Sequence, residues 1–376
     1  MARSDGEDWD VLLADDRARI APADGRADAL LSADTKTWNE IAADVRRGMD
    51  AYQRGRLSIR RNLHAGVGFL AATSGATGPG RLRFRMVQTP GARLSTMEAG
   101  EGPPVLALHG LGATKGSFLP TVAGLASGFR VIAVDLPGFG DSDKPIGAAY
   151  DARFFAAAGV ELLDALALDR VHVIGNSLGG RIALEMGLRH PGRVGRLALL
   201  APSLAWRRER PGRGLLRLTR PELGLVQLAP RTVVEAIVHR LIPSAEQGWT
   251  AAGVDEFLRA YLTPTGRAAF YAAARQIYLE EPHGEEGFWT RLPTLQARAL
   301  FVWGRRDRLV PLAFARHVAD ALPRVRHVEL DCGHVPQIER AHETNDALIA
   351  FLSAPGGRFA RSDPADLSGP ARVARG

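Results

Sequence analysis

A serine flanked by glycines lies where a strand pattern changes into a helical one. The segment GNSLGG at 175–180 follows an apolar run and precedes a helical pattern from Leu178 to His190. A serine at such a strand-to-helix turn has a strained backbone that only small neighbours tolerate, and the turn lifts its hydroxyl clear of the sheet. The N–H groups and the positive end of the following helix favour a developing oxyanion at the same spot. The pattern therefore predicts Ser177 as a nucleophile.

A histidine and an aspartate after later strand patterns supply the two other groups that a serine nucleophile needs. His334 lies in the loop LDCGH after the last predicted strand, and Asp307 follows the apolar run ALFVWG. A neutral imidazole accepts the serine proton, and the carboxylate fixes the imidazole tautomer by accepting its Nδ1–H. An alternative for Asp307 is a solvated loop carboxylate paired with a neighbouring arginine. The chain order Ser177, Asp307, His334 favours a catalytic triad.

The segment HGLG at 109–112 predicts further hydrogen-bond donors for the same chemistry. We assign the backbone N–H groups of Leu111 and Leu178 to an oxyanion hole, because both lie at the carboxyl ends of adjacent predicted strands. The alternative is that His109 and Gly110 merely form a tight turn. Attack by an activated serine needs no metal and no organic cofactor, and we predict neither.

Six short apolar runs, separated by helical patterns, must position these residues. The runs lie at 105–110, 131–138, 171–177, 197–203, 299–304 and 325–331. Runs rich in Val, Leu and Ile are typical of strands that are buried on both faces of a parallel sheet. Strand and helix in alternation predict a doubly wound, mostly parallel α/β sheet. The alternation breaks from about 203 to 292, where we predict an inserted helical cap over the carboxyl end of the sheet.

Two compositional breaks divide the chain into three predicted parts. The stretch TSGATGPG at 73–80 is typical of a linker, so we predict a small α+β segment at 1–75 and a main domain at 81–353. In the first part we expect strands in VLLADDRARI and ADALLSAD, then a helix, a short strand RLSIRR and a second helix. The tail at 354–376 has no apolar period, and we expect it to be disordered.

Composition narrows the classes of function. The 376 residues carry a formal net charge of +7, but the arginines are scattered and form no block that would follow a nucleic-acid backbone, so we predict no nucleic-acid partner. A single cysteine and an acidic, polar start predict a cytoplasmic protein. The stretch WRRERPGRGLLRLTR from Trp206 onward leaves open a transient contact with an anionic membrane surface. Oligomeric state is not predicted.

From about Arg81 to Leu352 the sequence resembles the α/β-hydrolase superfamily. The resemblance includes DLPGFGDSDKP at 135–145 and GHVPQIE at 333–339, which look like the branch of esterases, lipases and meta-cleavage-product C–C hydrolases. It implies an α/β-hydrolase fold with a Ser-Asp-His triad. The segment before it resembles the later part of a sterol-carrier-type lipid-transfer domain, which implies that this segment presents or senses an acyl chain.

We predict hydrolysis of a hydrophobic carboxylic ester, lipid-like or with a small acyl group, through an acyl-enzyme. C–C bond hydrolysis of the meta-cleavage type is an alternative. The resembling C–C hydrolases usually carry tryptophan after the catalytic histidine, whereas this chain has Val335. A second alternative is a non-catalytic lipid-binding protein on a hydrolase scaffold.

Overall fold

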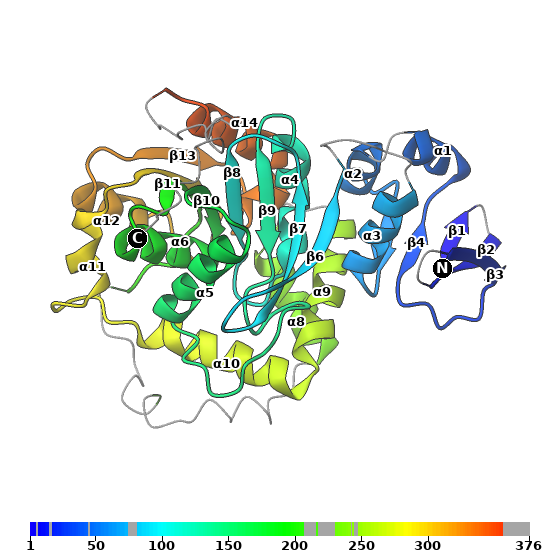
Figure 1. Ribbon diagram of the computed structural model, residues 1–376, viewed down its shortest axis with the longest axis horizontal. Coiled ribbons are helices and arrows are strands. Elements are labelled where there is room, and N and C mark those ends of the chain that lie inside the picture. The colour runs from blue at the N-terminus through cyan, green and yellow to red at the C-terminus, as the bar shows by residue number, and fades with distance from the viewer. Residues whose placement is uncertain are drawn as a thin grey trace, which may run out of the picture.

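Two β-sheets organise the described part of the chain (Figure 1). The structure is a computed structural model that describes residues 1–4, 7–14, 17–43, 46–73, 81–206, 216, 230–241, 243 and 247–355. Within these residues, one sheet has eight strands in the order β13-β12-β11-β10-β8-β9-β7-β6, and the other has five in the order β3-β2-β1-β4-β5.

The large sheet is mostly parallel. Its strands are β6 (Arg83–Gln88), β7 (Arg93–Ala99), β8 (Pro104–Leu108), β9 (Arg130–Val134), β10 (Val171–Asn176), β11 (Val194–Leu200), β12 (Arg298–Gly304) and β13 (Arg326–Leu330). All neighbours from β9 through β8 to β13 pair in parallel, whereas β7 pairs antiparallel with both β9 and β6. The predicted fold class is therefore confirmed, and the carboxyl ends of the parallel strands meet at one edge of the sheet.

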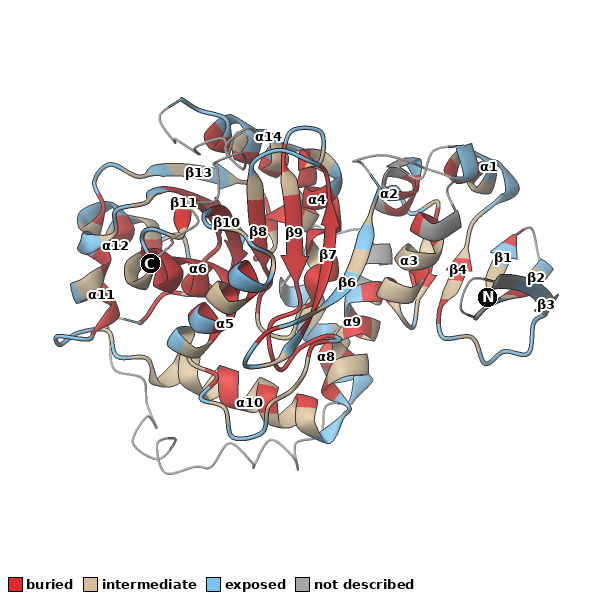
Figure 2. Cartoon of the chain, viewed as in Figure 1, coloured by how far each residue is buried: buried red, intermediate tan, exposed pale blue. Residues whose placement is uncertain are grey.

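Side chains of the central strands enter two separate cores, one on each face of the sheet. In β8, Leu106 and Leu108 join one core, and Val105 and Ala107 join the other, as the two-residue period of a strand requires. Figure 2 shows these strands buried along their length. Helices pack on both faces: α5 (Ala152–Ala165), α6 (Leu178–Arg189) and α12 (Phe314–Ala321) on the first, α4 (Leu119–Leu125) and α14 (Ala341–Leu352) on the second.

The N-terminal segment packs onto the second face. Its elements are β1 (Ala2–Ser4), β2 (Glu7–Ala14), β3 (Arg17–Pro22), β4 (Leu30–Ser32), α1 (Thr35–Ala43), α2 (Arg46–Gln53), β5 (Ser58–Arg60) and α3 (Leu63–Thr73). Buried Leu31, Ile59 and Leu63 belong to the same hydrophobic core as α4 and α14. In Figure 1 this segment lies beyond β6, with α3 nearest to the large sheet. The boundary between the parts at 75–81 stays a prediction.

Some strands differ from the predictions. The run VLLADDRARI forms parts of two strands, because β2 and β3 pair antiparallel with Ala14 opposite Arg17. Strands β6 and β7 precede the first apolar run of the main domain. No apolar run in the sequence predicted these two strands. Strand β6 is a mostly exposed edge strand, and β7 buries Glu98, which three arginines neutralise: Arg83, Arg85 and Arg130.

Helices occupy the described chain between β11 and β12. They are α8 (Arg231–Leu241), α9 (Gln247–Tyr261), α10 (Pro264–Leu279), α11 (Phe288–Arg291) and the 3₁₀ helix η3 (Leu292–Thr294). We name α8, α9 and α10 the cap helices. Two further short helices are η1 (Lys115–Phe118) and α13 (Pro336–Glu339). The predicted disordered tail from 356 onward, and the arginine-rich stretch at 207–220 apart from Leu216, lie outside the described residues. Within the described ranges, every helix is too short or too polar to cross a bilayer.

Candidate active site

Ser177 occupies a strained turn between β10 and α6. Its φ of 53° and ψ of −116° lie in a region that side chains other than glycine rarely adopt. The turn is crowded, because a side chain on Gly179 would overlap the carbonyl group of Leu108 and one on Gly175 would overlap the backbone of Gly179. Ser177 is the N-cap residue of α6. The first N–H groups of a helix have no acceptor within the helix and are available to a ligand there.

His334 and Asp307 form a buried hydrogen-bonded pair. The Nδ1 of His334 lies 2.8 Å from Oδ2 of Asp307, and the other carboxylate oxygen accepts the N–H groups of Leu309 (2.8 Å) and Val310 (3.0 Å). An ionised carboxylate only accepts, so Nδ1 carries a proton, and in the neutral ring Nε2 then has a free lone pair. That Nε2 is buried and has no hydrogen-bond partner among the described residues.

The neighbouring arginines do not form the alternative ion pair with Asp307. Arg305 pairs with Glu329 at 3.4 Å, and Arg306 pairs with Asp331 at 3.0 Å. The carboxylate of Asp307 is fully buried and is held by the imidazole and two backbone N–H groups. The arrangement is the one required to orient an imidazole.

Two side chains that the sequence did not single out hold the histidine loop. The carboxylate of Glu339 accepts the N–H of Gly333 (2.9 Å) and that of Val335 (3.2 Å), the residues on either side of His334. The amide of Asn176 donates to the carbonyl oxygen of His334 at 3.1 Å. Asn176 directly precedes Ser177, so the serine turn and the histidine loop touch. In the sequence, Asn176 occupies the first variable position of G-x-S-x-G, and Glu339 is the acidic residue five positions after His334. These two positions are the signals that could have identified them.

The loop after β8 lies beside the serine. A Cβ added to Gly110 would lie 3.2 Å from the Cβ of Ser177. The buried ring of His109 fixes this loop, because its Nδ1–H donates to the carbonyl of Gly110 (2.8 Å) and its Nε2 accepts the N–H of Leu136 (3.0 Å). Burial lowers the pKa of His109, which keeps the ring neutral. Leu111 follows in the same loop, in a position compatible with an oxyanion hole that it would share with the first N–H of α6.

A profile of the alpha/beta hydrolase fold family matches residues 103–341. The chain belongs to this family. The 2-hydroxy-6-oxo-6-phenylhexa-2,4-dienoate hydrolase of Comamonas testosteroni is 31% identical over 268 residues, 68% of this chain and 89% of that protein. The 2-hydroxymuconate semialdehyde hydrolase of Pseudomonas putida is 31% identical over 281 residues, 72% of this chain and 94% of that protein.

One similar solved structure is described as a membrane phospholipase A, a bacterial virulence factor. It has 29% sequence identity and a TM-score of 0.63, and the match covers 77% of this chain and 90% of that one. The family match begins at residue 103 and does not confirm the sterol-carrier resemblance of the N-terminal segment, which stays a prediction.

In this alpha/beta hydrolase, the cap helices meet the loop after β8. A Cβ added to Gly112 would lie 2.8 Å from the ring of Phe257 on α9 and 3.1 Å from that of Phe270 on α10. A cavity of about 420 Å³ lies between α8 and the loop that carries Asp307. Its lining is rich in cationic side chains: His239, Arg240, Pro243, Arg305, Arg306, Asp307 and Arg308. An anionic group would be attracted to this cavity, which borders Asp307 but is lined by neither Ser177 nor His334.

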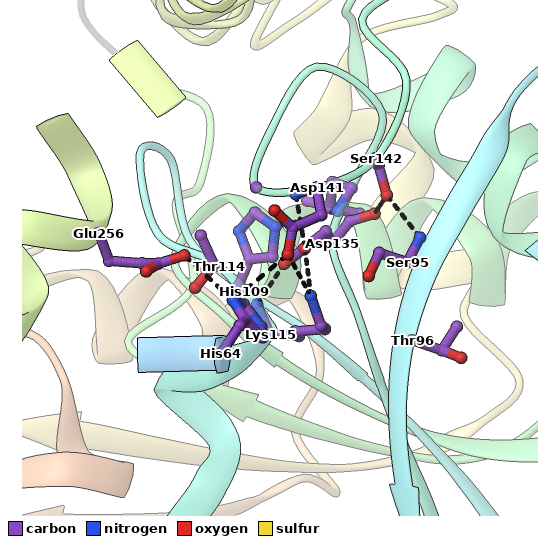
Figure 3. Close-up of polar contacts among 12 residues, drawn as sticks. His64, Ser95, Thr96, His109, Thr114, Lys115, Asp135, Asp141, Ser142 and Glu256 are labelled. Carbon is purple, nitrogen blue, oxygen red and sulfur yellow. Dashed lines mark hydrogen bonds and ion pairs between the residues drawn. The ribbon is translucent and has the colours of Figure 1, made fainter. Parts of the chain in front are cut away.

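Among the described residues, His64, Asp135 and Asp141 form a group whose ligand atoms lie within 4.8 Å of one another, close enough to hold a metal ion. An ammonium group already neutralises it, because Nζ of Lys115 lies 2.6 Å from Asp135 and 3.2 Å from Asp141 (Figure 3). Arg259 adds a second cation, 2.7 Å from Asp141. We therefore interpret this group as a charge network and propose no metal there.

Cys332 lies two residues before His334 and is fully buried. Burial raises the pKa of its thiol to about 12, so the thiol stays protonated at neutral pH. The side chain fills space beneath the histidine loop and offers no nucleophile of its own.

Proposed function

We propose that Ser177, His334 and Asp307 are the catalytic triad of a hydrolase that attacks a carbonyl carbon. The supporting observation is the imidazole of His334, held by Asp307 with a free Nε2, next to the strained serine turn. The serine hydroxyl adds to the carbonyl carbon while Nε2 takes its proton, and the backbone N–H groups of Leu111 and Leu178 stabilise the oxyanion. The imidazolium then protonates the leaving group, and water releases the acyl group.

The first candidate substrate is a conjugated keto acid of the 2-hydroxy-6-oxo-dienoate type. The two curated relatives described above are hydrolases named for such compounds or for the related 2-hydroxymuconate semialdehyde, which favours the C–C alternative over the ester prediction. In this reaction the carbon–carbon bond next to the oxo group breaks. The carbonyl carbon gains the oxygen of water, and the neighbouring carbon gains a proton. The arginine-lined cavity beside Asp307 has the charge to attract the carboxylate of such a substrate, although neither Ser177 nor His334 lines it.

The second candidate substrate is a hydrophobic carboxylic ester. The similarity to a solved phospholipase A supports it, as does Val335 after the histidine. The cap helices also bring aromatic rings together near the loop after β8, because Phe257, Tyr261 and Phe270 contact one another. An apolar wall of this kind suits an acyl chain.

Purified protein should be assayed with 2-hydroxy-6-oxo-6-phenylhexa-2,4-dienoate and with p-nitrophenyl esters of increasing acyl length. We expect the higher kcat/KM for the keto acid, with benzoate as a product. Turnover of esters alone would contradict the C–C proposal and leave the ester candidate.

The serine variant tests the triad itself. Ser177→Ala should reduce kcat for either substrate by at least about 10³-fold, because triad members act as a unit. The matched control is Ser127→Ala, which changes an exposed serine in the turn after α4 and should leave kcat unchanged. Wild-type turnover in Ser177→Ala, or no labelling of the wild type by a fluorophosphonate, would contradict the catalytic proposal and favour lipid binding.

A further inference from the structure

Helix α9 offers two adjacent carboxylates to the N-terminal segment. Asp255 accepts a two-pronged contact from Arg60, with Nε at 2.7 Å and Nη2 at 3.2 Å, and also the N–H of Arg61 at 3.0 Å. Glu256 lies 3.1 Å from Nδ1 of His64, the second residue of α3. Segments some 190 residues apart in sequence are thus joined by four polar contacts.

The carboxylates and His64 in these contacts are largely shielded from water, whereas the side chain of Arg60 is 39% exposed. The side chains of Asp255, Glu256 and His64 are 9%, 5% and 9% exposed. Burial alone would raise the pKa of Asp255, but its hydrogen bonds with Arg60, with the N–H of Arg61 and with Arg231 of α8 lower it to about 2. Without Arg60, Asp255 would keep its ion pair with Arg231 of α8 at 2.7 Å, so the loss would weaken the tie to the N-terminal segment and leave the carboxylate partly compensated. The contacts therefore join α9 to the N-terminal segment, and Arg231 joins the same carboxylate to α8.

The next residue of α9 reaches the active-site loop. Phe257 packs against Gly112, two residues after Gly110, whose backbone borders Ser177. The first residue of α3, Leu63, packs against Gly116 of the same loop region, where an added Cβ would lie 3.0 Å from its side chain. Helix α9 is thus seated between the N-terminal segment and the proposed oxyanion loop.

The charge network in Figure 3 also contacts helix α9. Arg259, one turn after Glu256, donates to Glu256 at 2.6 Å and to Asp141 at 2.7 Å. Asp141 also contacts Lys115, which follows directly after the loop at 109–114. Glu256 and His64 meet at the edge of this network in the view. Three parts of the chain therefore converge on α9: the N-terminal segment, the loop after β8 and the loop after β9.

We propose that Arg60 and His64 are positioning residues of the cap. With Arg61, Asp255 and Glu256 they form a cap clamp, through which the N-terminal segment keeps α9 seated on the loop at 109–112. The clamp holds Phe257 against the loop at 109–112, in the apolar wall proposed above, and so controls how substrates reach Ser177. This consequence for substrates depends on the proposed function, whereas the seating of α9 does not.

The test compares Arg60→Gln with Arg3→Gln. Arg3 makes an equally two-pronged contact with Asp8, at 2.6 Å for both nitrogens, but within the small sheet and away from α9. In Arg60→Gln we expect amide hydrogen exchange in α9 to accelerate roughly tenfold, the usual effect of losing a hydrogen bond to a charged group. KM should change by a similar factor, with kcat altered less. Arg3→Gln should leave both unchanged.

A double-mutant cycle makes the coupling specific. Asp255→Asn combined with Arg60→Gln should accelerate exchange in α9 less than the product of the two single effects, because both remove the same contact. Multiplicative effects would contradict a direct clamp. His64→Gln provides an independent variant at the second contact and should also accelerate exchange in α9. It keeps the clamp testable if Arg60→Gln does not fold.

The outcomes separate the clamp from the proposed function. Equal exchange in α9 for Arg60→Gln and Arg3→Gln would overturn the clamp. Faster exchange in Arg60→Gln would also overturn it if KM stayed unchanged for short esters, long esters and the keto acid. Wild-type protein that a fluorophosphonate does not label, with exchange in α9 still faster in Arg60→Gln, would support the seating of α9 and reject the triad.

Discussion

Two buried histidine–carboxylate pairs in this molecule make similar contacts, yet we propose different roles for them. His334 lies 2.8 Å from Asp307, and His64 lies 3.1 Å from Glu256, in each case through Nδ1. Both rings are largely buried, and neither Nε2 has a hydrogen-bond partner among the described residues. Distance and burial alone therefore do not distinguish them.

The surroundings of the two pairs distinguish them. Among the described residues, Asp307 is held by the imidazole of His334 and two backbone N–H groups, and of these partners only the imidazole can take up positive charge. Glu256 instead shares its oxygen with the guanidinium of Arg259, and His64 also faces Asp141 at 3.5 Å. A proton-accepting pair needs a free lone pair beside a nucleophile. A pair inside a compensated network is suited to holding two segments together.

The largest expected difference is between the two carboxylates. Asp307→Asn should lower kcat by about 10³- to 10⁴-fold, because an amide no longer fixes the Nδ1–H tautomer or stabilises the imidazolium. Glu256→Gln should change kcat by less than about tenfold and act mainly on KM, because it loosens α9 without touching the reacting atoms. Steady-state kinetics on both variants decide the matter. Equal losses of kcat would remove the distinction.

A second prediction concerns how firmly the catalytic pair is held. Glu339→Gln should lower kcat by roughly 10- to 100-fold with little change in KM, because only one oxygen remains to accept the two N–H groups beside His334. The downfield proton NMR signal of the His334 Nδ1–H should also shift or broaden. The exposed Glu343→Gln is the matched control. An unchanged spectrum with unchanged kcat would show that Glu339 does not position the ring.

The smallest predicted effect is an acid dependence of the cap clamp. Asp255 has a folded-state pKa of about 2, below the roughly 3.9 of an unfolded chain, so its ionised form stabilises the folded protein at neutral pH. That contribution should be lost as the pH falls from about 4 to about 2. The difference in free energy of unfolding between wild type and Asp255→Asn, measured in urea, should shrink over this interval. A constant difference would show that Asp255 is not held by charge.

The sequence predicted those parts of the fold that depend on apolar runs. Strands β8 to β12 are mostly buried on both faces, so their side chains have to be apolar and can be recognised in the sequence. Strand β7 escaped prediction because it buries Glu98, whose burial is tolerable only with arginines from β6 and β9. A pattern within one segment cannot show such a partner. The same holds for β6, whose exposed face carries no apolar signal.

The residues of the site also differ in whether the sequence alone could predict their roles. Ser177, Asp307 and His334 each follow a strand, and parallel strands bring their carboxyl ends to one edge, so the three could be chosen from the sequence. The roles of Asn176 and Glu339 depend on which backbone groups a fold leaves nearby. The cap clamp depends on two segments some 190 residues apart, and no local rule connects Arg60 with Asp255.

The burial of Cys332 makes the protein suitable for fluorescence work. It is the only cysteine of the chain, and with a thiol pKa of about 12 it should not react with a maleimide at neutral pH. Gly253 lies on the exposed side of α9 with open space around it, so Gly253→Cys would add a single reactive thiol there. A dye at that point would report movements of the helix, and Cys332 would not have to be replaced first.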